Sequence, residues 1–442
     1  MTARVPPAWR SVLPHLGYPL PPDRTPERTA GAGIGVNLPL ALVRQSIPGA
    51  EHWPVPEPVA EQYRRYRPTP LWRARHFERA VEARVPVYVK YEGGNISGSH
   101  KLNTALAQAH YYRRAGVAEL VTGTGAGQWG TALAAACAVF GLRCTVFMVA
   151  GSLRNKPYRG SLMRLLGATV HASPSGLTQV GRASGNGGNG LSLAIGEAVE
   201  YAARTDGCAF SIGSGETYSL LHQSVIGLEA IEQLRGGEVD EVGTIVGCLG
   251  AGSNFGGIAL PFFAESAATG RAGPRLVAAE STACPKLTRG AYAYDFTDAT
   301  GTGPMEAMYT VGSRLPITES HSAGLRFHGA AKLLSAMRHH GQIDAVAIGQ
   351  REALRAAALF TRTESVLPAP EAGHALAAAA RLAARPQAAG TVLVCVSGHG
   401  LLDLAAYDQH LAGELGDDTP TAEQLQAAMA GLDHVAELGT SI

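Results

Sequence analysis

From Val87 onward, short apolar runs alternate with longer alanine-rich stretches, and this alternation constrains the fold more than any other feature of the chain. The apolar runs predict strands at Val87–Tyr91, Leu120–Thr122, Cys144–Met148, Ala168–His171, Thr244–Cys248, Leu276–Ala279 and Val392–Val396. The longer stretches predict helices at Thr104–Arg114, Trp129–Phe140, Tyr158–Leu166, Ser192–Ala203, Leu220–Leu234 and Glu352–Phe360. Strands separated by helices at this spacing predict an α/β fold with mostly parallel sheets covered on both faces.

Composition excludes several classes of protein. The 442 residues suffice for two domains, and 46% apolar against 17% charged residues favours large buried cores over disorder. A net charge of +1 without a basic run argues against a nucleic-acid partner. No apolar stretch reaches the roughly 18 residues of a membrane span, and the N-terminus lacks a signal-peptide core, so we expect a cytoplasmic protein. The six cysteines have no CxxC spacing, which predicts buried free thiols and no metal site.

Lys101 is the most informative single residue, because only five of the 37 cationic residues are lysines. It lies in Ser97-Gly98-Ser99-His100-Lys101, between a predicted strand and a predicted helix. A cation is disfavoured at a helix N-terminus, where the helix dipole is positive. The same position suits an amine that needs a lowered pKa, such as a Schiff-base lysine. The alternative is a solvated lysine in a turn.

Two glycine-rich turns follow predicted strands and open predicted helices. Gly250-Ala251-Gly252-Ser253-Asn254 predicts a phosphate cradle, because small residues let backbone N–H groups converge on an anion at a helix N-terminus. It lacks the Lys-Ser/Thr of a nucleotide P-loop, so a phosphate monoester suits it better than a triphosphate. The alternative is a tight strand–helix turn without a ligand.

The second turn, Thr124-Gly125-Ala126-Gly127-Gln128-Trp129-Gly130, predicts a carboxylate-binding loop. It also matches the GxGxxG pattern of dinucleotide sites, which calls for an acid about 20 residues later. No Asp or Glu occurs between Glu119 and Glu197, so the dinucleotide reading depends on an arginine such as Arg154 and is the weaker one.

Ser397, in Ser397-Gly398-His399-Gly400, follows the last clear strand. Its hydroxyl could bond an unprotonated pyridine nitrogen, whereas a nucleophilic serine would need a GxSxG elbow that the chain lacks. A Schiff-base lysine, a phosphate cradle and a carboxylate loop on one α/β scaffold together predict pyridoxal phosphate acting on an amino acid.

These motifs, in this order, resemble those of tryptophan synthase β-subunits, and most of all the stand-alone second class. The match runs from Arg67 to Tyr407 and includes the following segments: Arg67-Pro68-Thr69-Pro70-Leu71, Lys90-Tyr91-Glu92-Gly93, Gly98 to Ala105, Gly125 to Gly130, Lys156-Pro157-Tyr158-Arg159, Leu220-Leu221-His222-Gln223, Gly324-Leu325-Arg326, Pro368-Ala369-Pro370-Glu371 and Ser397 to Gly400. The resemblance implies a pyridoxal phosphate lyase of fold type II, a homodimer without a dedicated α-subunit.

The resemblance also implies roles for individual residues. Lys101 forms the Schiff base and moves the proton at Cα, and His100 lies beside the cofactor phosphate. Glu280 lies near the cofactor ring, and Ser397 faces its nitrogen. Further cofactor-binding residues are Asn103, Gly250, Ala251, Gly252, Ser253 and Asn254, and the substrate-binding residues are Gly123, Thr124, Gly125, Ala126, Gly127, Gln128 and Trp129.

The predicted organisation has four parts. Residues 1–66 form a proline-rich N-terminal extension, and residues 411–442 form a helical tail. The large cofactor domain comprises 67–99 and 223–410, and the smaller domain, with a mobile subdomain, comprises 100–222. Within it, Gly181–Gly190 is predicted to be a flexible loop.

Two departures from the family pattern bear on the substrates. The family has Thr-Glu-Thr-Gly-Ala-Gly where this chain has Thr122-Gly123-Thr124-Gly125-Ala126-Gly127, so Gly123 replaces the acid that assists hydroxide loss. A positioned general acid–base contributes about 10²–10⁴-fold in rate, and a glycine offers only space and room for a water. Glu216, in Gly213-Ser214-Gly215-Glu216, is a new carboxylate that we expect to take over this catalytic role.

We therefore expect β-replacement on L-serine, with indole or another nucleophile, by an enzyme specialised in its substrates. One alternative is a serine or threonine deaminase, which releases pyruvate or 2-oxobutyrate without an added nucleophile. Another is a homologue that binds the cofactor without turnover. A dinucleotide oxidoreductase is the remaining reading.

Overall fold

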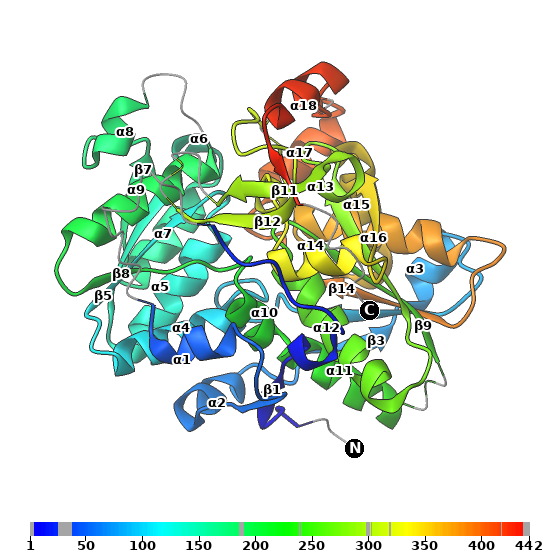
Figure 1. Cartoon of the computed structure of the whole chain (residues 1–442). Helices are drawn as coiled ribbons and strands as arrows, with labels where there is room; N and C mark the ends of the chain where they lie inside the picture. Colours follow the sequence, from blue (N-terminus) through cyan, green and yellow to red (C-terminus); the bar gives the residue numbers. More distant parts are fainter. Residues whose placement is uncertain are drawn as a thin grey trace.

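The structure is a computed structural model that describes residues 4–24, 38–184, 190–237, 239, 241–297, 301, 303–317, 320–416 and 418–435. Two sheets, one mostly and one wholly parallel, dominate it, with helices on both faces (Figure 1). This arrangement is the α/β class with mostly parallel sheets that the strand–helix alternation predicts. Among the described helices, none is both long enough and apolar enough to cross a membrane.

The larger sheet has six strands in the order β13-β10-β9-β14-β4-β3, and β3 runs antiparallel to β4. Alternate residues of its strands face different cores: Ile245 packs toward helix α12 (Ser253–Thr269), and Val246 packs toward helix α16 (Pro370–Ala383). The strands are β13 (Asp344–Ile348), β10 (Arg275–Ser281), β9 (Val242–Cys248), β14 (Thr391–Val396), β4 (Val87–Tyr91) and β3 (Leu71–Arg73).

The smaller sheet has four parallel strands in the order β7-β6-β5-β8. They are β7 (Thr169–Ser173), β6 (Arg143–Val149), β5 (Glu119–Thr124) and β8 (Cys208–Phe210). On one face Val121 packs against helix α9 (Leu191–Arg204), and on the other Leu120 joins the core that contains helix α5 (Gln128–Phe140). Because neighbouring parallel strands end at the same edge of a sheet, the turns after β9 and β14 lie together. The turn after β5, in the other sheet, lines an adjoining cavity.

The remaining elements complete the layers and the ends of the chain. The N-terminal part contains β1 (Ala8–Arg10), η1 (Leu13–His15), α1 (Leu40–Gln45), β2 (His52–Pro54), α2 (Glu57–Tyr63) and α3 (Arg75–Ala80). The middle contains α4 (Leu102–Arg114), α6 (Ala150–Asn155), α7 (Pro157–Leu165), α8 (Gln179–Ala183), α10 (Thr217–Gln223), α11 (Val225–Gly236) and α13 (Lys286–Arg289). The last part contains the antiparallel sheet of β11 (Ala291–Phe296), β12 (Met305–Thr310) and β15 (Asp433–His434), with η4 (Ala323–Leu325), α14 (Lys332–His339), α15 (Gln350–Glu364), α17 (Leu404–Ala412) and α18 (Ala422–Met429).

The seven predicted strands and five of the six predicted helices are confirmed within a few residues at their ends. The helix predicted at Leu220–Leu234 is two helices, because the chain breaks at Ser224 between α10 and α11. All six cysteines are buried and free, as their scattered spacing predicts. The predicted loop Gly181–Gly190 begins inside α8, and its residues 185–189 lie outside the described part of the chain.

Candidate active site

Lys101 is the N-cap residue of α4, in a turn fastened to the end of β14. The backbone N–H of His100 donates to Ser397 O at 2.9 Å, and the N–H of His399 donates to Gly98 O at 3.0 Å. Burial lowers the pKa of Lys101, although the carboxylate of Glu371 acts against this shift. Lys101 therefore tends toward the neutral amine that a Schiff base requires.

The turn between β9 and α12, which the sequence predicts to be an anion cradle, lines a cavity that also contains Lys101. A Cβ atom at Gly250 would lie 2.2 Å from Gly324 O, so only glycine fits there. Gly252 has a φ of +127°, whereas Ala251 is not among the residues with positive φ, which explains why alanine is tolerated at 251. The helix that starts at Ser253 begins with backbone N–H groups that have no partner within the helix, and such groups can bind an anion.

His100 is held beside the cradle by both ring nitrogens. Its Nε2 lies 3.0 Å from the hydroxyl of Ser253, and its Nδ1 lies 3.2 Å from Ser397 O. Burial, and then the charge of Lys101, lower the pKa of His100 to about 3. A neutral His100 can therefore donate from Nδ1 to the carbonyl oxygen and accept the Ser253 hydroxyl at Nε2.

The acid in this cavity is Glu371, and the prediction that Glu280 lies there is corrected. Glu280 does not line the cavity, because its carboxylate accepts the backbone N–H groups of Leu287 and Thr288 at 2.8 and 2.9 Å. Glu371 does line it, and accepts from Gln128 Nε2 at 3.1 Å and from the Gly324 N–H at 2.9 Å. Glu371 ends the motif Pro368-Ala369-Pro370-Glu371, but the motif alone does not indicate that this acid faces Lys101.

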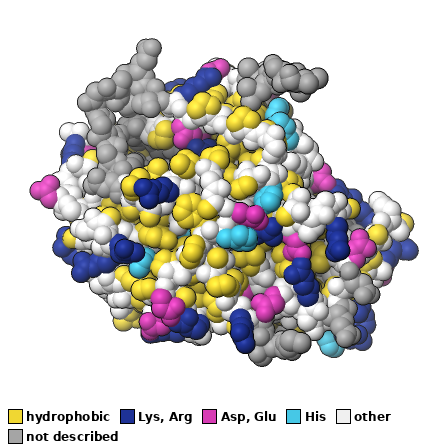
Figure 2. Space-filling model, turned by 60° about the horizontal axis from the view of Figure 1, so that its bottom comes forward, with side chains coloured by type: hydrophobic (Ala, Val, Ile, Leu, Met, Phe, Trp, Pro, Cys, Tyr) yellow, Lys and Arg dark blue, Asp and Glu magenta, His cyan; other side chains and the backbone are white. Residues whose placement is uncertain are grey.

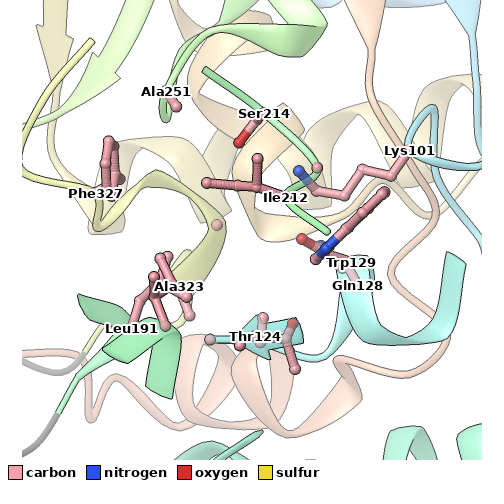
Figure 3. A pocket seen from close by; sticks show the side chains of 16 residues that line it. Lys101, Thr124, Gln128, Trp129, Leu191, Ile212, Ser214, Ala251, Ala323 and Phe327 are labelled. Atoms are coloured by element: carbon pink, nitrogen blue, oxygen red, sulfur yellow. The ribbon is translucent and has the colours of Figure 1, made fainter. Parts of the chain in front are cut away.

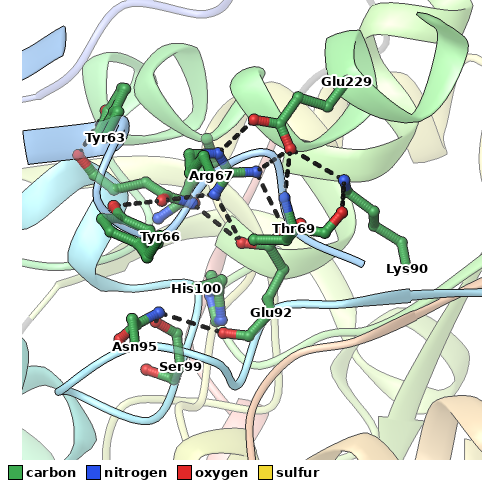
Figure 4. A network of polar contacts seen from close by, with 12 residues as sticks. Tyr63, Tyr66, Arg67, Thr69, Lys90, Glu92, Asn95, Ser99, His100 and Glu229 are labelled. Carbon is green, nitrogen blue, oxygen red and sulfur yellow. Dashed lines mark hydrogen bonds and ion pairs between the residues drawn. The ribbon is translucent and has the colours of Figure 1, made fainter. Parts of the chain in front are cut away.

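Asn103, predicted to bind the cofactor, lies instead in a buried polar network behind the Lys101 turn (Figure 4). The guanidinium of Arg67 joins the carboxylates of Glu92 and Glu229 at 2.9 and 2.7 Å, and donates to Asn103 Oδ1 at 2.8 Å. Lys90 Nζ adds a further contact to Glu229 at 2.9 Å. Burial alone would raise the pKa of Glu92, but the charge and hydrogen bonds of Arg67 hold it at about 2. The network ties α2, β4 and α11 to the base of α4 and so fixes the Lys101 turn.

A second, adjoining cavity contains most of the predicted substrate-binding residues (Figure 3). Its lining includes Gly123, Thr124, Gly125, Ala126, Gln128 and Trp129, whereas Gly127 is not among the lining residues and serves as the αL N-cap of α5. We call this cavity the apolar chamber, because its far side consists of Leu191, Ile195, Ile212, Ala323 and Phe327. Among the side chains that line the apolar chamber, that of Lys101 is the only ionisable one. Gly324 and Ala251 also line both cavities, so the two cavities adjoin.

Gly123 does not leave free space, which corrects the expectation that a water could take the place of its side chain. A Cβ atom there would lie 2.5 Å from the carbonyl carbon of Ala194 and from the backbone nitrogen of Ile195. Helix α9 therefore rests on the backbone of β5 at this residue. The side chains of Leu191 and Ile195, on the same helix, form part of the chamber wall.

Glu216 does not line either cavity, so the prediction that it acts as the catalytic acid is corrected. It is the N-cap residue of α10, and its electrostatic neighbours are Lys332, Asp23 and Glu306. Burial raises the pKa of Glu216, and burial together with Glu216 raises the pKa of Glu306 to about 8. Gly213 and Ser214, from the same segment, do line the chamber, so the segment was placed correctly although its carboxylate was not.

Three comparisons with known proteins agree with this geometry. Residues 63–398 match the family described as pyridoxal-phosphate dependent enzyme. The tryptophan synthase beta chain of Thermococcus gammatolerans is 42% identical over 429 residues, which are 95% of this chain and 97% of the relative. The tryptophan synthase beta chain of Pyrobaculum islandicum is 46% identical over 413 residues, 92% of this chain and 97% of the relative.

Two solved structures share the fold at low sequence identity. The processed form of threonine deaminase isoform 2 from Solanum lycopersicum has a TM-score of 0.60 at 17% identity, over 89% of this chain and 99% of that chain. A fungal L-serine ammonia-lyase from Rhizomucor miehei has a TM-score of 0.59 at 16% identity, over 78% of this chain and 98% of that chain.

Proposed function

This chain belongs to the family of pyridoxal-phosphate dependent enzymes, and from that membership we propose that it catalyses β-replacement on L-serine. Pyridoxal phosphate is its cofactor, and the enzyme is a lyase similar to tryptophan synthase β chains. In the proposed reaction the β-hydroxyl of serine leaves as water and a nucleophile forms the new bond to the β-carbon.

The cavities fit the cofactor. The Lys101 amine, the N-terminus of α12 and the hydroxyl of Ser397 surround one cavity, as an aldehyde, a phosphate and a pyridine nitrogen would require. When bound, the cofactor withdraws electrons from the substrate α-carbon. We assign the phosphate to the backbone N–H groups of 250–254 with His100 beside it, and the ring to the space between Ser397 and Glu371.

The other steps fall to residues of the chain itself. The backbone N–H groups of residues 124–128 hold the substrate carboxylate at the start of α5. The Lys101 amine removes the proton from Cα and returns it after the new bond forms. Burial lowers the pKa of Lys101 and so favours the neutral amine that this step needs. Glu371, fixed by Gln128 and Gly324, faces Lys101. We assign to it the proton that the departing hydroxyl takes, which Glu371 regains from the entering nucleophile or from solvent.

The apolar chamber is the observation that favours replacement over deamination. A deaminase needs only water beyond the β-carbon, whereas Leu191, Ile195, Ile212 and Phe327 offer a wall for an apolar nucleophile. No carboxylate among the described residues lines the chamber. The chamber therefore suits a nucleophile that does not need a carboxylate to accept an N–H proton. An aromatic carbon or a thiol that ionises in solution meets this condition, and we propose that the enzyme is specialised for such a nucleophile.

We also propose that the enzyme is a homodimer without an α-subunit. Helix α1, at the lower left of Figure 1, and the turn that follows it expose Leu40, Val43 and Ile47, by 63%, 38% and 54%. Figure 2 shows hydrophobic side chains gathered over the middle of this lower face. A contiguous apolar surface of this kind is typical of a subunit interface.

The proposed reaction is tested by mass spectrometry of the products from ¹³C-labelled L-serine, with indole and with an apolar thiol such as benzenethiol. A labelled β-substituted alanine that depends on the added nucleophile supports the proposal. Labelled pyruvate, formed equally with and without a nucleophile, would replace it by deamination.

A further inference from the structure

A separate polar cavity lies behind η4, on the side away from the catalytic site. Its volume is about 270 Å³, against about 60 Å³ for the apolar chamber on the same scale. Since one water needs roughly 10–15 Å³ on such a scale, the polar cavity has room for a small metabolite. Ala323 lines both the polar cavity and the chamber, so η4 is a wall that they share.

The lining of the polar cavity has nearly balanced charge. Lys156 and Arg326 are its cations and Asp418 is its acid. A second acid, Asp403, stands directly behind Lys156 and accepts from its Nζ at 2.5 Å. His321 adds no charge at neutral pH, because burial lowers its pKa. A polyanion such as a nucleotide would therefore find no excess of positive charge here.

The polar groups of the cavity are already fixed in place. Lys156 Nζ also donates to His321 O at 3.2 Å, and the His321 ring lies 2.8 Å from Gln409 Oε1. Gln350 donates from Nε2 to Gly416 O at 3.0 Å, while its Oε1 is buried without a partner. The hydroxyl oxygen of Ser320 is likewise buried without a partner. Buried polar atoms normally have hydrogen-bond partners, so two of them in one polar cavity indicate a ligand.

From this arrangement we infer that the polar cavity is a second binding site, and that it takes a small α-amino acid in its zwitterionic form. Lys156 and Arg326 receive the carboxylate, and Asp418 receives the ammonium group. Ser320 and Gln350 complete the hydrogen bonds. The site is distinct from the catalytic one, because it contains neither Lys101 nor the anion cradle.

An occupant of this site would affect the catalytic site through η4. The walls come from α6 and Lys156 on one side and from α15, α17 and the C-terminal tail on the other. A bound amino acid would hold these parts together and press against the back of η4, whose Ala323 and Gly324 line the chamber. If the amino acid binds more tightly to one position of η4 than to another, its binding increases the population of the preferred position.

The test is calorimetric titration of holoenzyme that has first been treated with borohydride. This treatment reduces the bond between Lys101 and the cofactor, so that amino acids can no longer become covalently attached to the cofactor, and the variants of the polar cavity locate the binding that remains. L-serine and L-alanine are the probes, with acetate and ethylamine as carboxylate-only and ammonium-only controls. We expect at least one of the two amino acids to bind with one site per chain, and acetate and ethylamine to bind at least tenfold more weakly.

Variants of two residues decide whether this binding occurs in the polar cavity. Ser320→Ala removes an oxygen that has no partner in the protein, so we expect an unchanged melting temperature and about fivefold weaker binding. Gln350→Leu should weaken binding in the same way, and Ser161→Ala, on the exposed side of α7, is the matched control. The inference is overturned if neither amino acid binds, if acetate binds as tightly, or if both variants bind like wild type.

Discussion

Gly123 and Ala194 are in direct backbone contact: a Cβ atom on Gly123 would lie 2.5 Å from the carbonyl carbon of Ala194. The contact seats α9 on β5 and brings Leu191 and Ile195 to the wall of the apolar chamber. The family resemblance leads us to expect a glutamate at this residue. The glycine found there is required by the packing of α9 on β5.

Restoring a glutamate at this residue should not restore a working acid. Gly123→Glu forces α9 away from β5, and overpacking of this kind typically costs about 1–3 kcal/mol of unfolding free energy. We expect a lower melting temperature and no gain in tryptophan formation from serine and indole. Gly236→Glu, at an exposed glycine with open space around it, is the control and should change neither. A faster Gly123→Glu enzyme of normal stability would contradict the packing argument.

Glu371 and Glu280 are two buried acids with different predicted effects. Glu371→Gln should lower kcat by about 10²-fold or more, because it removes the carboxylate that faces Lys101. Glu280→Gln should act on stability, because that carboxylate accepts the N–H groups at the start of α13. Steady-state kinetics and melting curves of both variants separate the two roles. Equal losses of kcat in both variants would contradict the assignment of Glu371 to the reaction and of Glu280 to stability.

The acids Glu216 and Glu306 should make the protein less stable as the pH rises. Burial raises the pKa of both, to about 8 for Glu306, so between about pH 5 and 8 the folded state binds more protons than the unfolded state. Stability then falls with increasing pH, in spite of the nearby Lys332. We expect melting temperatures of Glu306→Gln to vary less over this range. Glu216→Gln should keep turnover within about twofold, and a large loss of kcat would return Glu216 to the catalytic site.

The Arg67 network should be a major source of stability. Arg67→Ala leaves two buried carboxylates without their cation, which typically costs about 3–5 kcal/mol. Arg64→Ala removes an exposed ion pair with Glu57 and should cost about 0–1 kcal/mol. Urea denaturation of the two variants measures the difference. A small effect of Arg67→Ala would show that the network does not hold the Lys101 turn in place.

Local patterns predicted the backbone of this protein better than the direction of its side chains. The strands and the glycine turns at 124–130 and 250–254 follow from residue type, because apolar periodicity and small residues act within a few positions. Whether a carboxylate faces the cavity depends on packing between distant segments. Glu216 and Glu280 turn away because Lys332 and the start of α13 lie near them, and neither neighbour is evident from the local sequence.

Asn103 and Glu371 also show that the local sequence does not fix which side chains face the cavity. Asn103 lies two residues after Lys101, but the helix turns it toward Arg67 and Glu92, away from the cavity. Glu371 is far from Lys101 in sequence and reaches it because α16 begins beside the end of β14. The close approach of α9 to Gly123 is likewise a contact between separate segments.

The most direct measurement is visible absorption of the holoenzyme during titration with L-serine, followed by addition of indole or an apolar thiol. We predict that serine shifts the cofactor band, and that an added nucleophile returns it to the starting position as the product leaves. A band that serine does not shift, or a shifted band that decays to pyruvate at the same rate with every nucleophile, would contradict β-replacement on L-serine.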